Sequence, residues 1–228
     1  MNEQIKSCME FENALRKFQK EFRKQNLDQL GGVDLKYNWK WSSELLQTWI
    51  TDILNCDSLS NKESLKTEFK HVSRKYRTGA MLARMESDYE NDDIVHIDGF
   101  TIYVIKDFIY EVIAKNHDKL DEFFDYCKLM TRHEFGHCLD YMAYVGMSYK
   151  DFYFYQREIR AKYNVQMLEE IQHMDRSRKK MTKFHTLMID GVPMHYLKFE
   201  EIAANKKAGF TPEELKRFYD YSDLFDIR

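Results

Sequence analysis

The sequence is poor in the residues that interrupt secondary structure. It contains only two Pro and eight Gly among its 228 residues. Proline breaks the interior of a helix and glycine weakens it, so this scarcity favours a protein made mostly of long helices. The 16 Phe, 15 Tyr and 3 Trp supply enough bulky apolar side chains to fill a core. A chain of this length forms one sizeable domain or two small ones.

Four further absences exclude classes of function. No stretch approaches the roughly 20 apolar residues that span a bilayer, and the first residues lack the basic and apolar regions of a signal peptide. The net charge of −3 gives no electrostatic footprint for nucleic acid. The four cysteines show no paired spacing and are interpreted as reduced thiols. We therefore expect a cytoplasmic protein with neither a membrane nor a nucleic-acid partner. These cysteines are Cys8, Cys56, Cys127 and Cys138.

Residues 131–140 contain the pattern His-Glu-x-x-His. Residues four apart on a helix lie one above the other, so His133 and His137 present two imidazoles on one face. Two imidazoles so placed can hold a zinc ion, which lowers the pKa of a bound water. Glu134 is then within reach to accept the proton of that water as general base. The pattern predicts a Zn²⁺-dependent peptidase that acts on a protein or peptide substrate.

The sequence around this pattern is predicted to be helical from Asp118 to about Val145. It contains no Pro, its first turn is acidic, and apolar residues recur at helical spacing. Gly136 lowers helix propensity by about 1 kcal/mol relative to Ala, which makes sense if another backbone or a substrate comes close. Asp140 lies on the same face as His137. It is predicted either to orient a ligand imidazole through a hydrogen bond or to be an ordinary solvated carboxylate.

A catalytic zinc usually has three protein ligands, and Ala143 occupies the position where a third His of this helix would stand. Glu158 is the first choice for the third ligand. If the chain reverses at 146–147, an antiparallel helix brings Glu158 to the height of the two imidazoles. Glu201 is the alternative, because small residues follow it at the positions where helices approach closely. Both assignments remain open at this point.

The run His-Glu-Phe-Gly-His-x-x-Asp at 133–140 resembles the active helix of the anthrax lethal factor-like peptidases. It is also similar to that of the ImmA/IrrE-type peptidases, and both groups are zincin metallopeptidases of the gluzincin type. The resemblance implies a zincin-like core, a β-sheet upstream of the active helix, a zinc ion and peptide hydrolysis. In the ImmA/IrrE type the third ligand opens a Glu-x-x-Ala-(Asp/Asn) motif. Residues 158–162 match it except for a final Lys, whereas residues 201–205 match it throughout.

Peptidases of this kind often use a Tyr or a His to stabilise the oxyanion of the tetrahedral intermediate. The resemblance does not choose among the residues that could do so here. The candidates are Tyr153, Tyr155, His185, His195 and Tyr196.

The whole chain is predicted to form a single α+β, mostly helical domain, 1–228, with a helical N-terminal part at 1–90 and the metallopeptidase core at 91–228. The clearest β signal predicts a hairpin, in which strands at 93–97 and 100–105 are joined by Asp98-Gly99. Further helices are expected at about 150–172, at 200–207 and from Thr211 onward.

Residues 3–29 are predicted to form an amphipathic helix with an apolar seam at heptad spacing. The seam either packs on its own domain or mediates self-association. It also supports a different class of function, a zincin-fold interaction or regulatory protein without proteolytic activity, for which this seam would be the docking surface.

Overall fold

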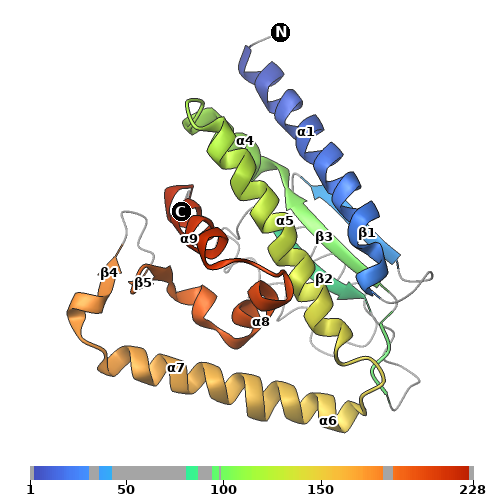
Figure 1. Ribbon diagram of the computed structural model, residues 1–228, viewed down its shortest axis with the longest axis vertical. Helices are drawn as coiled ribbons and strands as arrows, with labels where there is room; N and C mark the ends of the chain where they lie inside the picture. The colour runs from blue at the N-terminus through green and yellow to red at the C-terminus, as the bar shows by residue number, and fades with distance from the viewer. Residues whose placement is uncertain are drawn as a thin grey trace, which may run out of the picture.

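The structure, a computed structural model, describes residues 3–30, 36–42, 81–86, 94–97, 99–181 and 187–225. It confirms the α+β, mostly helical class. Helix α5 runs through the middle of the molecule, with α1 and three strands on one side and α8 and α9 on the other (Figure 1). Among the described helices, none is both long and apolar enough to cross a membrane. The elements in chain order are α1 (Glu3–Asn26), η1 (Leu27–Leu30), β1 (Lys36–Ser42), β2 (Met81–Glu86), β3 (Gly99–Ile105), α4 (Lys106–Lys115), α5 (Leu120–Met142), α6 (Tyr149–Phe154), the π-helical η2 (Tyr155–Arg160), α7 (Ala161–His173), η3 (Arg176–Arg178), β4 (Lys179–Met181), β5 (Leu187–Ile189), β6 (Val192–Pro193), η4 (Met194–Leu197), α8 (Phe199–Lys207) and α9 (Pro212–Leu224).

A three-stranded sheet precedes α5, with β3 at its centre, parallel to β1 and antiparallel to β2. The predicted hairpin is wrong, although its second strand exists as β3. Residues 94–97 leave the sheet, and the amide of Val95 donates to the carbonyl of Met147 at 2.8 Å. The reason is burial: nearly every residue of β3 is buried, so the strand needs a neighbour on each side and cannot be half of an isolated hairpin. Asp98, the first residue of the predicted turn, lies outside the described residues.

Two described segments of the N-terminal part are strands and not helices. Residues 36–42 and 81–86 are strands β1 and β2, which corrects the prediction of a helical part at 1–90. Residues 81–86, Met-Leu-Ala-Arg-Met-Glu, are good helix formers, but pairing with β3 overrides that local preference. The residues between these two strands lie outside the described part of the chain.

Helix α1 is present where the heptad seam predicts it, and the seam packs within the chain. The rings of Phe11 and Phe123 are stacked with centroids 5.2 Å apart, and Phe22 meets Phe135 edge-on at 5.3 Å. Leu15 is fully buried between these contacts. The seam is therefore used to hold α1 against α5.

Local capping signals mark the starts of α6 and α9, two of the helices that follow α5. The Ser148 hydroxyl accepts a hydrogen bond from the amide of Asp151 at 3.1 Å and begins α6. Thr211 and Glu214 form a reciprocal capping box at the start of α9. The expected helices near 150–172, at 200–207 and from Thr211 onward are thereby confirmed, the first with a π-helical segment inside it.

Candidate metal centre

The His-Glu-x-x-His pattern lies on the buried side of α5. The His133 and His137 rings follow one another by one helical turn, with centroids 4.8 Å apart and planes at 82°. His133 is 2% exposed and Glu134 is 5% exposed. His133 packs against the rings of Tyr196 and Phe218, which fix the plane of its imidazole.

Gly136 lets α8 approach the two imidazoles. A Cβ atom built on Gly136 would lie 2.1 Å from the carbonyl oxygen of Ala204 and 3.2 Å from the Cβ of Ala208. Real Cβ atoms do not come this close to a backbone oxygen, so α5 and α8 can pack at this distance only with glycine here. Of the two predicted reasons for Gly136, a close backbone or a close substrate, the structure shows the backbone, and it belongs to α8.

Close packing of α8 brings Glu201 beside both imidazoles. Its Oε2 atom lies 3.0 Å from Nε2 of His133 and 3.6 Å from Nε2 of His137. Donor atoms around a tetrahedral zinc, each about 2.1 Å from the ion, are separated by about 3.4 Å. The two observed distances lie on either side of that value, and the potential ligand atoms of the three residues are all within 4.8 Å of one another. Two imidazoles and one carboxylate are a donor set that suits a catalytic zinc.

Asn205 lies one helical turn after Glu201 and contacts the other nitrogen of the same imidazole. Its Oδ1 atom lies 2.8 Å from Nδ1 of His133. An amide oxygen only accepts hydrogen bonds, so Nδ1 carries the proton and Nε2 is the nitrogen that faces Glu201. Fixing the tautomer in this way is the usual role of a residue behind a metal ligand. Sequence reasoning gave Asn205 only as part of a motif, without this role.

The contact between His133 and Glu201 shifts the pKa values of both side chains. Burial acts to lower the pKa of His133, but the hydrogen bond and charge of Glu201 outweigh it, so the pKa is raised above its ordinary value. Burial also acts to raise the pKa of Glu201, and the two histidines outweigh it and hold the pKa well below its ordinary value. A carboxylate that stays ionised is the form that binds a metal.

The prediction that Glu158 lies beside the imidazoles is wrong. Helices α6 and α7 diverge from the C-terminal end of α5 instead of running back along it. Helix α8 lies in the angle between α5 and these two helices (Figure 1). Glu158 is exposed on the π-helical segment. Arg160 is the residue of that segment that is turned toward α5, and it is 6% exposed.

Asp140 does not orient a ligand imidazole. Its carboxylate pairs with Arg160, which also donates to the hydroxyl of Tyr144 at 2.9 Å. Asp140 is buried, so it is not an ordinary solvated carboxylate either. It joins the end of α5 to the π-helical segment, and the side chain that contacts Nδ1 of His133 is Asn205.

The candidates for oxyanion stabilisation are dispersed. Tyr153 is exposed, Tyr155 packs against Phe199, and His185 lies outside the described residues. Tyr196, with His195 beside it, adjoins the centre: its ring is buried with its centroid 5.6 Å from that of His133, and burial raises its pKa well above the usual range.

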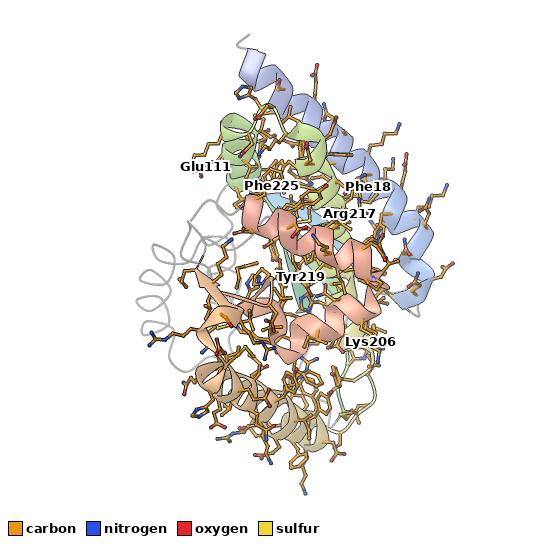
Figure 2. All side chains as sticks on the ribbon, turned by 60° about the vertical axis from the view of Figure 1, so that its left-hand side comes forward. Phe18, Glu111, Lys206, Arg217, Tyr219 and Phe225 are labelled. Atoms are coloured by element: carbon orange, nitrogen blue, oxygen red, sulfur yellow. The ribbon has the colours of Figure 1, made fainter. Side chains whose placement is uncertain are left out.

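Tyr219 is a residue at the centre that sequence reasoning missed. It extends from α9 (Figure 2), and its hydroxyl accepts a hydrogen bond from Nδ2 of Asn205 at 3.4 Å. Burial and the charge of Glu201 raise its pKa, so the phenol stays protonated at neutral pH. No local sequence signal marks Tyr219, because its place depends on how α9 packs against α8.

Comparisons of the chain with models of known protein families, with curated proteins and with solved structures find no match. Any functional assignment therefore depends on the residues of this centre.

Proposed function

We propose that the chain is a zinc-dependent peptidase with His133, His137 and Glu201 as its metal ligands. The observation that carries the proposal is the convergence of these three side chains from two helices, with Glu134 next to the first ligand. A zinc ion held there would act as a Lewis acid and lower the pKa of water to near neutrality.

The residues of the chain have separate roles in this proposal. Glu134 accepts a proton from the attacking water and later passes it to the leaving amine. Asn205 holds the Nδ1–H of His133, so that its Nε2 lone pair is directed to the metal. Tyr219 and Tyr196 are the phenols near the centre that could donate to a developing oxyanion. The substrate class is a protein or peptide.

The proposal also places the protein in a reducing compartment, the cytoplasm. Cys8, Cys127 and Cys138 are buried free thiols. Burial raises the pKa of Cys138, and such a thiol is protonated and inert. Stable buried thiols are typical of proteins that work where disulfides do not persist.

The test compares zinc-loaded wild type, Glu134→Gln and Glu158→Gln on a library of unmodified peptides, with cleavage products identified by mass spectrometry. Glu134→Gln should keep one zinc per chain, because Glu134 is not a ligand, and lose roughly 10²- to 10⁴-fold in cleavage rate. Glu158→Gln removes an exposed carboxylate of the same type and should cleave like wild type.

Retained cleavage in Glu134→Gln would remove the proposed base. If wild type binds zinc tightly yet cleaves no peptide in the library, the hypothesis of an interaction or regulatory protein replaces that of a peptidase.

A further inference from the structure

Arg132 directly precedes the first proposed ligand on α5, but its side chain is bound to a different helix. Its Nη2 atom donates to the backbone carbonyls of Ala208 and Gly209, each at 3.3 Å. These carbonyls lie just beyond the C-terminal end of α8, where a helix leaves its last carbonyls without partners inside the helix. Gly209 reverses the chain there with a φ of +66°.

The same guanidinium also holds the start of α9. It forms an ion pair with Glu214 and lies over the ring of Phe210, with its Cζ atom 4.7 Å from the ring centroid. Glu214 is the capping-box residue of α9, and its Oε2 accepts from the amide of Thr211 at 3.0 Å. One arginine thus joins three pieces of chain: α5, the end of α8 and the beginning of α9.

The position of α8 determines the geometry of the proposed centre. Glu201 and Asn205 are one turn apart on α8 and meet opposite nitrogens of His133, at 3.0 Å and 2.8 Å. A movement of α8 away from α5 would lengthen both contacts. Gly136 permits the close approach of α8, and polar side chains at the two ends of α8 help to hold the helix at that distance.

The N-terminal end of α8 is held separately. The Oδ1 atom of Asn164, on α7, accepts a hydrogen bond from the amide of Phe199 at 2.9 Å, and its amide group donates to Glu200 at 3.1 Å. Arg132 holds the opposite end, nearer to Asn205.

We propose that Arg132 is a positioning residue of the metal centre, which holds the C-terminal end of α8 against α5 so that Asn205 and Glu201 stay in register with His133. Arg132 touches neither metal nor substrate in this account. The inference deepens the proposed function and rests on it for the metal, but its effect on Asn205 and His133 does not require a metal.

The chain offers a matched control in Arg217. This arginine, on α9 (Figure 2), also pairs with a carboxylate across helices, donating to Asp125 of α5 at 2.9 Å. It joins α5 to α9 without an observed bond to α8. Loss of Arg217 therefore removes an α5–α9 ion pair and leaves the end of α8 in place.

The experiment uses the full chain as Arg132→Met, Arg132→Lys and Arg217→Met beside wild type. Zinc affinity is measured by competition with a chromophoric chelator. Residues behind metal ligands typically contribute 10- to 100-fold in affinity, so Arg132→Met should bind zinc roughly 10- to 100-fold more weakly. Arg132→Lys keeps the charge but not the planar fork, so it should fall between wild type and Arg132→Met. Arg217→Met should match wild type.

A second readout omits zinc altogether. In protein with ¹⁵N-labelled histidine and no added metal, the His133 Nδ1–H bonded to Asn205 should exchange slowly with solvent. It should be absent in Asn205→Ala, which assigns the signal. It should remain in Arg217→Met and exchange fast in Arg132→Met, whose folded state is checked by its unfolding midpoint.

The outcomes separate the two proposals. If wild type shows the protected proton, Arg132→Met loses it while Arg217→Met keeps it, and wild type binds no zinc, the metal function fails and the positioning role stands. Equal protection in Arg132→Met and wild type, or equal losses in Arg132→Met and Arg217→Met, would overturn the positioning role. If Arg132→Met does not fold, Arg132→Lys decides: wild-type affinity together with wild-type protection would overturn it as well.

Discussion

Two segments of this chain share the local sequence Glu-Ile-x-Ala, yet one is on the surface and the other is packed against α5. The first, 158–161, lies on the surface at the π-helical segment, with Glu158 exposed and Arg160 buried. The second, 201–204, lies against α5, with Glu201 between two imidazoles and Ala204 fully buried. A carboxylate at helical spacing from small residues is therefore not sufficient to make a ligand. The facing helix must also admit close approach, and Gly136 does so only for the second segment.

The partner of each segment explains the difference further. Residues two apart on a helix face opposite sides, so a buried Arg160 turns Glu158 outward. Arg160 pairs with Asp140 and Tyr144 near the end of α5, one turn beyond His137. The second segment instead meets α5 at the turn that carries both histidines and Gly136. The two segments thus occupy successive parts of α5, and only one part carries imidazoles.

The largest expected effect comes from removing the carboxylate of each segment. Glu201→Ala removes a proposed direct ligand, so its zinc affinity should fall by more than that of a variant of a residue behind a ligand. Such a variant typically loses roughly 10- to 100-fold in affinity. Glu158→Ala should retain the wild-type zinc content, since its side chain is exposed. Elemental analysis of protein purified without added metal, followed by chelator competition, measures both. Loss of zinc in Glu158→Ala alone would show that the first segment, and not the second, supplies the ligand.

A smaller effect is expected from enlarging the alanine of each segment. Ala204→Val adds two methyl groups at a fully buried position beside Gly136 and should destabilise the fold by about 1–3 kcal/mol through overpacking. Ala161→Val makes the same change on an exposed face, where only the lower helix propensity of Val, about 0.6 kcal/mol, remains. Urea unfolding of both variants gives the difference, and equal destabilisation would show that α8 is not packed as tightly as Gly136 indicates.

Much of this architecture follows from local sequence. Helices α5, α6 and α9 were predictable because periodicity, the Ser148 cap and the capping box of Thr211 act over a few residues. His133, Glu134 and His137 follow from spacing on one helix. Gly136 also indicated the close approach of a backbone or a substrate, but the sequence could not say which one.

What the sequence did not predict depends on contacts between distant segments. The hairpin failed because β3 pairs with β1 and β2, and strand pairing is chosen by the sheet as a whole. The prediction of Glu158 as third ligand failed because of the direction that α6 and α7 take after α5. Arg160 helps to set this direction through its contacts with Asp140 and Tyr144. The contacts of residues 94–97 with the turn at 146–148 also contribute. No local sequence pattern predicts the contacts of Tyr219 and Arg132, because their partners lie far away in the sequence.

The smallest expected effect is a pH dependence at the end of the helix that carries the second segment, where Arg132 pairs with Glu214. The hydrogen bond from Arg132 lowers the pKa of Glu214 below its ordinary value of 4.5. The unfolded chain then binds more protons than the folded one below pH 4.5, so this stabilisation is complete above that pH and is lost as pH falls through the depressed pKa. Glu214→Gln should therefore lower the free energy of unfolding by about 1 kcal/mol or less at neutral pH.

That deficit should shrink toward zero in acid, where wild type is protonated as well. The measurement is urea unfolding of protein without added zinc between about pH 3 and pH 7, which keeps metal release out of the comparison. Glu213→Gln is the matched control, because Glu213 lies in the same first turn of α9 but is exposed. A deficit in Glu214→Gln that persists unchanged in acid, or one that Glu213→Gln reproduces, would mean that the pair with Arg132 does not stabilise the end of α8. The capping of α9 by Thr211 would then have to account for the stability of this corner alone.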